Sequence, residues 1–446
     1  MQYTTSFGGF LAATLATAGM VSAFPTIPPR VPVPVDAIAS ASGSVSMKQV
    51  RNNQYNGKSK HGTIALEKAY LKFNVMIPED VSSAVSRIRN ELLADLGHLA
   101  DLAGIGRPKY KRSNGSAITT PQEYDVEYLT PVQIGTPAQT LMLDFDTGSS
   151  DLWVYSSATP SSDVKGQTVY DPDQSETSMQ LQNATWSISY GDGSSSKGQV
   201  YYDNVTIGGL SVYPMAVEAA SDVSAEFTSD TDIDGLLGLA FSKLNTVKPN
   251  KQKTFFEAAQ NKLDSYLFTA DLKADAPGTY NFGFIDDTAY TGNISYTDVD
   301  TSGGFWKFST TGYQVGDGDY ESVPIHGIAD TGTTLMLLPT NVAVSYYQTV
   351  HNSSYDQTQG GFVFPCDAEL PDFSFGVGSE DGNTTVVVPG SYINYSPTDK
   401  TNATCYGGIQ GDSSIGFAIF GDIALKAAFV VFDGEKEQIG FATKNL

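Results

Sequence analysis

Residues 143–154 read Leu-Asp-Phe-Asp-Thr-Gly-Ser-Ser-Asp-Leu-Trp-Val, and residues 328–334 return to the pattern as Ile-Ala-Asp-Thr-Gly-Thr-Thr. Each stretch sets one aspartate, Asp146 or Asp330, before a Thr-Gly pair that two hydroxyl residues follow. Glycine lets backbones approach closely and adopts dihedral angles that other residues avoid, so each stretch predicts a tight turn holding its aspartate. One Asp-Thr-Gly arises easily by chance in a chain with 43 glycines, whereas two in similar settings indicate a repeat.

A second pair of matching stretches strengthens this interpretation. Asp234-Gly-Leu-Leu-Gly238 follows the first aspartate, and residues 418–422, Ala-Ile-Phe-Gly-Asp, follow the second at about the same spacing. Around them, short runs rich in Val, Phe, Tyr and Thr alternate with turn residues about every ten positions, which is typical of all-β domains. We therefore predict two similar β units in tandem, each with one Asp-Thr-Gly turn.

The expected elements are mostly short strands. Strands are predicted at residues 141–145, 185–190, 200–205, 279–284, 361–364 and 429–432. Helices are predicted at residues 78–103, 253–263, 339–351 and 422–428, the first from apolar residues recurring at three- and four-residue spacing.

Two aspartates on facing turns suit one kind of chemistry. Carboxyls a few ångströms apart cannot both ionise cheaply, so they share one proton. The ionised carboxyl can take a proton from water, while the protonated one polarises a peptide carbonyl. This pair would hydrolyse an amide by general acid–base catalysis without a covalent intermediate.

Other catalytic systems have little support in the sequence. After residue 112 the only histidines are His326 and His351, and no His-Glu-X-X-His spacing or convincing Gly-X-Ser-X-Gly elbow occurs. We therefore expect no metal and no cofactor. A secreted glycosidase with two carboxyls remains an alternative, against which the paired Asp-Thr-Gly turns argue.

The chain resembles the pepsin-like aspartic proteases, and most closely the fungal endothiapepsin-type enzymes. The likeness covers about residues 113–446. It rests on the two Asp-Thr-Gly stretches, on residues 187–194 (Ser-Ile-Ser-Tyr-Gly-Asp-Gly-Ser), on residues 234–240 and on residues 419–432. It implies an all-β, bilobal fold of two pseudo-symmetric antiparallel β lobes, with a signal peptide and a partly helical propeptide before them.

The resemblance also implies a role for each site residue. Asp146 and Asp330 would be catalytic and hold the lytic water. The supporting residues would be Thr147 and Thr331, which brace the turns, Ser149 and Thr333, which bond the outer carboxyl oxygens, and Gly148 and Gly332. The second alternative is a catalytically silent relative that acts as a binding or inhibitor protein. Such proteins typically lose a catalytic Asp or the tyrosine of the substrate-binding hairpin, whereas Asp146, Asp330 and Tyr190 are all present here.

A substrate-binding hairpin, the flap, is predicted where a strong turn signal separates two strand-like runs. Tyr190, Gly191, Asp192 and Ser194 would form it, with the Tyr190 hydroxyl reaching Trp153. Gly332 and Thr334, with Gly191 and Asp192, are candidates for backbone contacts to the substrate. By resemblance, the pocket for the residue before the cut would be lined by Asp144, Phe227 and Leu236.

Substrates should be proteins and peptides, bound as an extended strand. The resemblance predicts a preference for large hydrophobic residues around the cut and binding of pepstatin-like inhibitors. Asp192 could in addition accept a lysine before the cut, or it could serve only the turn.

The N-terminal part has a different character. Residues 1–23 are predicted to be a signal peptide, because an apolar run ends in Val-Ser-Ala. Residues 24–112 carry 13 Lys and Arg against 7 Asp and Glu and end in a dibasic pair, after which cleavage by a dibasic protease or self-cleavage nearby is possible. By analogy they form an inhibitory propeptide with one lysine on the dyad, and Lys72 and Lys109 are both candidates; assistance with folding alone is the alternative.

Charge and cysteines limit the setting of the protein. The net charge of −23 argues against nucleic-acid partners and suits acidic surroundings, or simply keeps the protein soluble. The two cysteines, Cys366 and Cys405, are predicted to form one disulfide if the compartment is oxidising, and are otherwise separate thiols. Eight Asn-X-Ser/Thr sequons fit a secreted glycoprotein.

The sequence thus predicts a secreted, extracellular, monomeric aspartic endopeptidase, made as a zymogen and without a membrane anchor. Its predicted segments are a signal peptide (1–23), a basic propeptide (24–112), an N-terminal β lobe with Asp146 and the flap (113–300), and a C-terminal β lobe with Asp330 (301–446).

Overall fold

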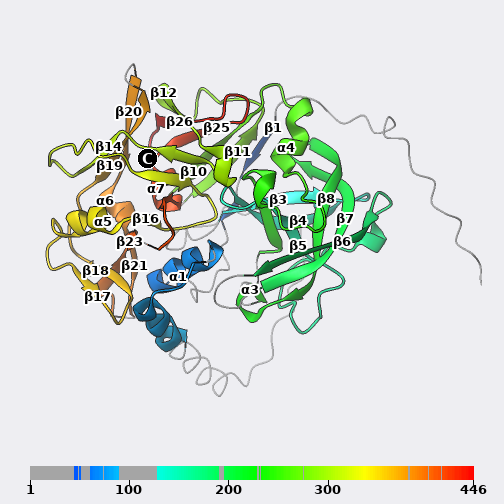
Figure 1. Cartoon of the computed structure of the whole chain (residues 1–446), viewed down its shortest axis with the longest axis horizontal. Coiled ribbons are helices and arrows are strands. Elements are labelled where there is room, and N and C mark those ends of the chain that lie inside the picture. Colours follow the sequence, from blue (N-terminus) through cyan, green and yellow to red (C-terminus); the bar gives the residue numbers. More distant parts are fainter. Residues whose placement is uncertain are drawn as a thin grey trace, which may run out of the picture. The chain divides into compact units, whose positions relative to one another are not determined.

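A computed structural model of the chain describes residues 45–48, 50–51, 61–73, 75–89, 128–189, 195–228, 231, 233–274, 276–379, 382–399, 401–412 and 414–446. All of them belong to one unit, residues 40–446. The predicted signal peptide, the dibasic junction, Lys109 and the tip of the flap lie outside the described residues. Strands predominate, as predicted (Figure 1).

Asp146 belongs to an eight-stranded sheet. In spatial order its strands are β2 (Val50–Arg51), β3 (Tyr128–Ile134), β4 (Gln139–Asp146), β9 (Gly235–Gly238), β5 (Leu152–Tyr155), β8 (Leu210–Val223), β7 (Ser195–Ile207) and β6 (Met179–Ser189). From Leu141 onward β4 is half-buried to buried, and it ends at the aspartate. A rigid strand therefore fixes the position of this carboxyl.

Asp330 follows a strand of a separate five-stranded sheet. Its strands, in spatial order, are β13 (Lys307–Ser309), β15 (His326–Ala329), β24 (Ala418–Phe420), β16 (Met336–Pro339) and β23 (Ile409–Asp412). β16 contains most of the apolar run at residues 335–338, just after the second Asp-Thr-Gly, and all but its last residue are buried.

The two sheets share one pairing scheme around their aspartates. β4 pairs in parallel with β9, β9 is antiparallel to β5, and β5 is parallel to β8. In the second sheet β15 pairs in parallel with β24, β24 is antiparallel to β16, and β16 is parallel to β23. The repeat read from the sequence is therefore a repeat of topology.

A six-stranded sheet combines strands from distant parts of the chain. Its order is β1 (Val45–Lys48), β11 (Ala276–Phe282), β10 (Leu267–Lys273), β25 (Phe429–Asp433), β26 (Gln438–Thr443) and β12 (Thr291–Asp298). Aromatic rings fill the core beneath it; Phe268 stacks on Phe432 with centroids 4.5 Å apart. This sheet joins segments that precede Asp330 to the C-terminal strands.

Two smaller sheets complete the β-structure. One contains β14 (Gly312–Val315), β19 (Phe373–Ser379) and β20 (Gly382–Val388). The other contains β17 (Ser354–Asp356), β18 (Gly361–Pro365), β22 (Thr404–Gly407) and β21 (Asn394–Pro397).

The helices are short. They are α1 (Gly62–Lys72), residues 79–89, α3 (Ala225–Thr228), α4 (Phe255–Ala259), α5 (Thr340–Tyr347), α6 (Gly390–Ile393) and α7 (Asp422–Leu425). The predicted helices at 253–263, 339–351 and 422–428 are present in shortened form; a capping box of Thr254 and Glu257 starts α4. The predicted helix 78–103 is described only over residues 79–89.

The sequence did not reveal α1. Residues 62–67, 69, 70 and 71 are all buried, so the helix has no wide polar face that would produce a recognisable amphipathic pattern. Its buried state depends on contacts with distant segments, among them Tyr406 of β22, whose ring lies against Gly62.

The predicted disulfide is present. Cys366 and Cys405 are bonded with their Cα atoms 4.8 Å apart, and the bridge links the end of β18 to β22. It closes a loop with a sequence separation of 39 residues. A cross-link over a loop of this length restricts the unfolded chain and thereby stabilises the folded one.

Replacing both cysteines by serine should lower the free energy of unfolding by about 4 kcal/mol, the chain-entropy value for this loop. Urea denaturation followed by fluorescence measures the loss. Cys366→Ser alone and Cys405→Ser alone should each cost nearly as much as the double variant, because either one breaks the same bond. An unchanged urea midpoint in the double variant would contradict a stabilising role.

Candidate active site

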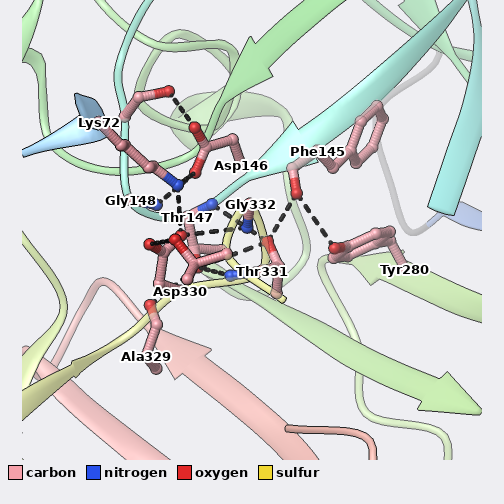
Figure 2. Close-up of polar contacts among 12 residues, drawn as sticks. Lys72, Phe145, Asp146, Thr147, Gly148, Tyr280, Ala329, Asp330, Thr331 and Gly332 are labelled. Carbon is pink, nitrogen blue, oxygen red and sulfur yellow. Dashed lines mark hydrogen bonds and ion pairs between the residues drawn. The ribbon is translucent and has the colours of Figure 1, made fainter. Parts of the chain in front are cut away.

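The two predicted catalytic carboxyls meet at one ammonium group. Lys72, the last residue of α1, places its Nζ atom 2.7 Å from Asp146 Oδ1 and 2.7 Å from Asp330 Oδ1 (Figure 2). The aspartate side chains are 1% and 0% exposed, and the lysine is 13% exposed. Two carboxylates that contact one nitrogen are close enough to share a proton once that nitrogen is absent.

Each carboxylate is oriented by its own turn. The donors are Gly148 N to Asp146 Oδ1 (2.8 Å), Ser149 Oγ to Asp146 Oδ2 (2.6 Å), Gly332 N to Asp330 Oδ1 (3.0 Å) and Thr333 Oγ1 to Asp330 Oδ2 (2.7 Å). In both turns the backbone donor takes the oxygen that faces Lys72, and the hydroxyl takes the other oxygen. The two halves are therefore equivalent in detail.

The turns are tied to each other by the two threonines. The backbone N–H of Thr147 donates to Thr331 Oγ1 at 3.1 Å, and the N–H of Thr331 donates to Thr147 Oγ1 at 3.0 Å. Their hydroxyls donate across to the carbonyls of Ala329 (2.9 Å) and Phe145 (2.6 Å), the residues before the aspartates. This threonine brace is buried and fixes one turn relative to the other (Figure 2).

The glycines of both turns make room for the opposite carboxylate. A Cβ atom on Gly148 would lie 2.5 Å from Asp330 Oδ1, and one on Gly332 would lie 2.4 Å from Asp146 Oδ1. Neither distance is possible between unbonded atoms, so only glycine permits this approach. The Asp-Thr-Gly pattern is thus a steric requirement for bringing the carboxyls together.

The second sequence echo has a steric reason of the same kind. A Cβ on Gly238, at the end of β9, would lie 2.5 Å from Ser150 Cα. A Cβ on Gly421, just after β24, would lie 2.2 Å from the Thr333 carbonyl oxygen. Each glycine lets its strand pass directly beneath the catalytic turn of its own sheet.

Burial and neighbouring charges shift the pKa values of the two aspartates in opposite directions. Burial alone would raise the pKa of Asp146, but the Lys72 ammonium and the turn hydrogen bonds outweigh it and lower that pKa. For Asp330, burial and the adjacent Asp146 charge outweigh Lys72 and raise the pKa. Burial also disfavours the Lys72 charge, but the attraction of both carboxylates prevails and raises its pKa.

Four of the predicted flap-contact and substrate-contact residues lie together near the strand that ends at Asp146. Trp153 faces Leu236 across the β5–β9 pair, and its ring is 5.2 Å from that of Phe227. Asp144 faces Leu236 from β4, two residues before Asp146. Burial and then the Asp146 charge raise the pKa of Asp144 to about 8, so this carboxyl is protonated in acid.

The flap is described only in part. β6 and β7 pair antiparallel up to Ser189 and Ser195, as a hairpin requires. Tyr190, Gly191, Asp192 and Ser194 form its tip and lie outside the described residues, so their predicted contacts stay predictions. Thr334, another predicted contact residue, is half-buried, and its carbonyl accepts the Ile423 N–H at 3.0 Å.

Sequence reasoning missed a pair of buried carboxyls behind the first turn. Asp151 Oδ1 accepts the Asn245 amide (2.8 Å) and the Thr246 N–H (2.8 Å), and the same amide donates to Glu218 Oε1 (2.9 Å). Burial and the Asp151 charge raise the pKa of Glu218 well above 4.5, and burial raises that of Asp151. Both carboxyls therefore keep their protons to higher pH than exposed carboxyls do. Asp151 and Glu218 are too far apart in sequence to form a motif.

Within the described residues, no group of three or more His, Cys, Asp or Glu side chains is placed to hold a metal ion. The same residues include no helix long and apolar enough to cross a membrane.

Residues 127–444 match the sequence profile of the family described as eukaryotic aspartyl protease. The chain belongs to this family. Endothiapepsin of Cryphonectria parasitica is 53% identical over 93% of this chain and 94% of its own length. Podosporapepsin of Podospora anserina is 48% identical over 98% of both chains, and aspergillopepsin-1 of Aspergillus fumigatus is 44% identical over 98% of both.

A solved structure agrees on the fold. The aspartic proteinase from Irpex lacteus matches with a TM-score of 0.59 and 24% identity, over 72% of this chain and 95% of that one. The predicted pepsin-like, mainly β fold is thereby confirmed. The family assignment makes the chain an aspartic-type endopeptidase and removes the glycosidase alternative.

Glu218→Gln should protect the fold at high pH. Because the folded protein raises the pKa of Glu218, that residue favours folding below 4.5 and opposes it progressively as the pH rises. The glutamine side chain has the same shape but does not ionise. In thermal unfolding at a series of pH values, the melting temperature of Glu218→Gln should therefore exceed that of the unmodified protein by a margin that grows above pH 4.5. Glu321→Gln, on an exposed residue, is the control. Equal loss of stability in Glu218→Gln and the unmodified protein would contradict this account.

Proposed function

We propose that the protein is a secreted endopeptidase, made as an inactive zymogen, that cleaves peptide bonds in acid with Asp146 and Asp330 as its catalytic pair. The observation that carries the proposal is the pair of braced, buried carboxylates that converge on a single point. That point is now taken by the Lys72 ammonium, 2.7 Å from each.

In the proposed mechanism a water molecule takes the place of the ammonium between the two carboxyls. With one shared proton, the ionised carboxyl removes a proton from this water as it attacks the peptide carbonyl carbon. The protonated carboxyl donates to the carbonyl oxygen, and a tetrahedral intermediate forms. The carboxyl that took the proton from water then passes it to the amide nitrogen and the C–N bond breaks. The other carboxylate takes back a proton from a hydroxyl of the intermediate, so the acid and the amine leave and the dyad again holds one proton.

This mechanism requires acid because the pair must hold one proton. The aspartic-protease dyad is itself the standard illustration of two carboxyls that share a proton. Activity should fall at high pH, where the pair loses that proton, and at very low pH, where both carboxyls are protonated. The strong negative charge of the chain after residue 112 also suits acid, where partial protonation reduces self-repulsion.

Residues 24–112 act, in this proposal, as an inhibitory propeptide. Their described parts contact the enzyme at several places: β1 pairs with β11, Thr63 donates to the Gln359 carbonyl, and Tyr355 donates to Asp80 at 2.7 Å. Lys72 then blocks the dyad directly, which favours it over Lys109 as the inhibitory lysine. Basic propeptide and acidic enzyme also attract each other.

Acid should release the propeptide. The Lys72 ion pair lowers the pKa of Asp146, so its contribution to docking is complete above the ordinary pKa of 3.8 and disappears as the pH falls through the lowered value. Cleavage at or near the dibasic pair, by another protease or by the enzyme itself, would make removal permanent.

We propose substrate preference for large hydrophobic residues near the cut. Phe227 and Leu236 are only partly buried and pack against Trp153, so they offer apolar surface next to the strand that carries Asp146. Asp144, protonated in acid, adds no charge there. Asp192 on the flap would determine whether a lysine is also accepted before the cut, and pepstatin-like inhibitors would occupy the same site as substrates.

Secretion follows from residues 1–23, and glycosylation would accompany it. Of the eight sequons, those at Asn183, Asn293, Asn352 and Asn402 are exposed in the structure and are the proposed acceptors. Asn394 is a poor candidate because its amide donates to the Cys366 carbonyl at 3.0 Å. We propose a monomer, with lobes at residues 113–300 and 301–446.

Asp146→Asn should abolish activity of the acid-treated protein. Hydrolysis of denatured haemoglobin or casein against pH should be confined to acid in the unmodified protein and be blocked by pepstatin. Asp146→Asn should lower the rate by at least about 10³-fold, because the one remaining carboxyl cannot act as both acid and base. Asp317→Asn, on an exposed aspartate, is the control and should be fully active. No acid activity in the unmodified protein after confirmed removal of residues 24–112 would leave only a peptide-binding function.

Lys72→Met should weaken latency. The variant keeps a long apolar side chain on α1 but leaves the two carboxylates without a counter-ion, so the propeptide should dissociate at higher pH than in the unmodified zymogen. The pH midpoint of activation, followed with a fluorogenic peptide, measures this. Arg87→Met removes an exposed charge from the same segment and should not shift the midpoint. An unchanged midpoint in Lys72→Met would contradict the inhibitory role of Lys72.

A further inference from the structure

Tyr280 lies outside every motif recognised in the sequence, yet its hydroxyl reaches the backbone beside the dyad (Figure 2). The residue is in β11 and is 1% exposed. Its hydroxyl donates to the Phe145 carbonyl at 3.3 Å and also interacts with the Thr331 side chain. That carbonyl belongs to the residue directly before Asp146.

The same carbonyl is part of the threonine brace. Phe145 O accepts the Thr331 hydroxyl at 2.6 Å, so two hydroxyls, from the second turn and from β11, converge on one acceptor. Both bonds are buried, where a hydrogen bond is stronger and a lost partner costs more than at the surface. Tyr280 thus shares the Phe145 carbonyl with the threonine brace, which holds the two turns together.

The Tyr280 ring is held as firmly as its hydroxyl. It packs on the Phe145 ring with centroids 5.0 Å apart, and Phe282 of the same strand packs on Phe145 from 6.4 Å. β11 belongs to the six-stranded sheet that includes β25 and β26. The side chain therefore connects that sheet to the end of β4, where Asp146 begins its turn.

The charged groups around Tyr280 leave its hydroxyl a donor throughout the working range. Asp144 and Asp146 of β4 and Asp422 of α7 are the carboxyls whose charges act on it. Burial, followed by the charges of these carboxyls, raises the pKa of Tyr280 well above 10.0. The hydroxyl is therefore always protonated when the enzyme acts.

We propose that Tyr280 is a positioning residue for peptide hydrolysis, whose hydroxyl fixes the Phe145 carbonyl and so helps the threonine brace to set the distance between Asp146 and Asp330. This inference rests on the proposed catalytic role of the dyad. The separation of the carboxyls decides how strongly they couple, because the repulsion between two charges grows as they approach. A looser brace should weaken that coupling.

Tyr280→Phe removes the hydroxyl and keeps the packed ring. Measured on acid-activated protein with a fluorogenic peptide, kcat should fall by about tenfold, the value of one buried hydrogen bond, with KM unchanged. The bell-shaped pH profile of kcat should also become narrower, since weaker coupling brings its two limbs together. Pepstatin titration of active sites refers each rate to correctly folded enzyme, even if the yield is low.

Tyr347→Phe is the matched control. Tyr347 is 2% exposed, and its hydroxyl donates to the Ile409 carbonyl at 2.7 Å. That hydrogen bond involves neither Asp-Thr-Gly turn. The variant should lose thermal stability but keep the unmodified kcat and pH profile. If Tyr280→Phe behaves like this control, with only stability reduced, its role is structural and the inference is overturned. That outcome leaves the proposed function intact, because the proposed function fails on other results: an active Asp146→Asn variant, or no acid activity in the unmodified protein once residues 24–112 are removed.

Discussion

Asp146 and Asp330 each lie 2.7 Å from one ammonium nitrogen while almost fully buried, a spacing at which two negative charges repel strongly. Without a counter-ion the pair can avoid this repulsion only by keeping a proton. A shared proton gives one residue the properties of a base and its neighbour those of an acid. The chemistry of the family depends on that difference, and the fold has to maintain the short distance against the repulsion.

Several layers of structure maintain it. The innermost is the threonine brace, which ties the two turns through four buried hydrogen bonds. Around it, two sheets with the same strand pairing place each aspartate at the buried end of a strand, and Gly238 and Gly421 let further strands pass beneath the turns. The six-stranded sheet adds Tyr280 against the Phe145 carbonyl. Proximity of the carboxyls is thus a property of the whole fold.

If residues 24–112 inhibit the enzyme as proposed, the same geometry would keep the zymogen inactive with its site already assembled. A site that attracts a proton at acidic pH attracts a lysine ammonium when the proton is absent. Lys72 reaches it because α1 is buried against distant strands, with Gly62 under the Tyr406 ring. In this account one electrostatic feature, a concentrated negative charge, serves inhibition near neutral pH and catalysis in acid.

The sequence predicted what short patterns encode. The paired Asp-Thr-Gly turns, the glycine echoes, the disulfide and most strands follow from local residue types, because each reflects a steric or hydrogen-bonding need of a few neighbours. It did not predict α1, the Asp151–Glu218 pair or Tyr280. The helix is buried on nearly all sides, and the carboxyl pair and the tyrosine act on partners far away in the chain, so no local periodicity or spacing records them.

The most direct test is to follow the carboxyl carbons of Asp146 and Asp330 by NMR across the acid range, in labelled protein from which residues 24–112 have been removed. Asp146→Asn and Asp330→Asn samples would assign the signals. Two coupled titrations, one below and one above the ordinary aspartate pKa of about 3.9, would support a shared proton. If both carboxyls instead titrated together near 3.9, the two groups would not be coupled, and the account of the site given above would be wrong.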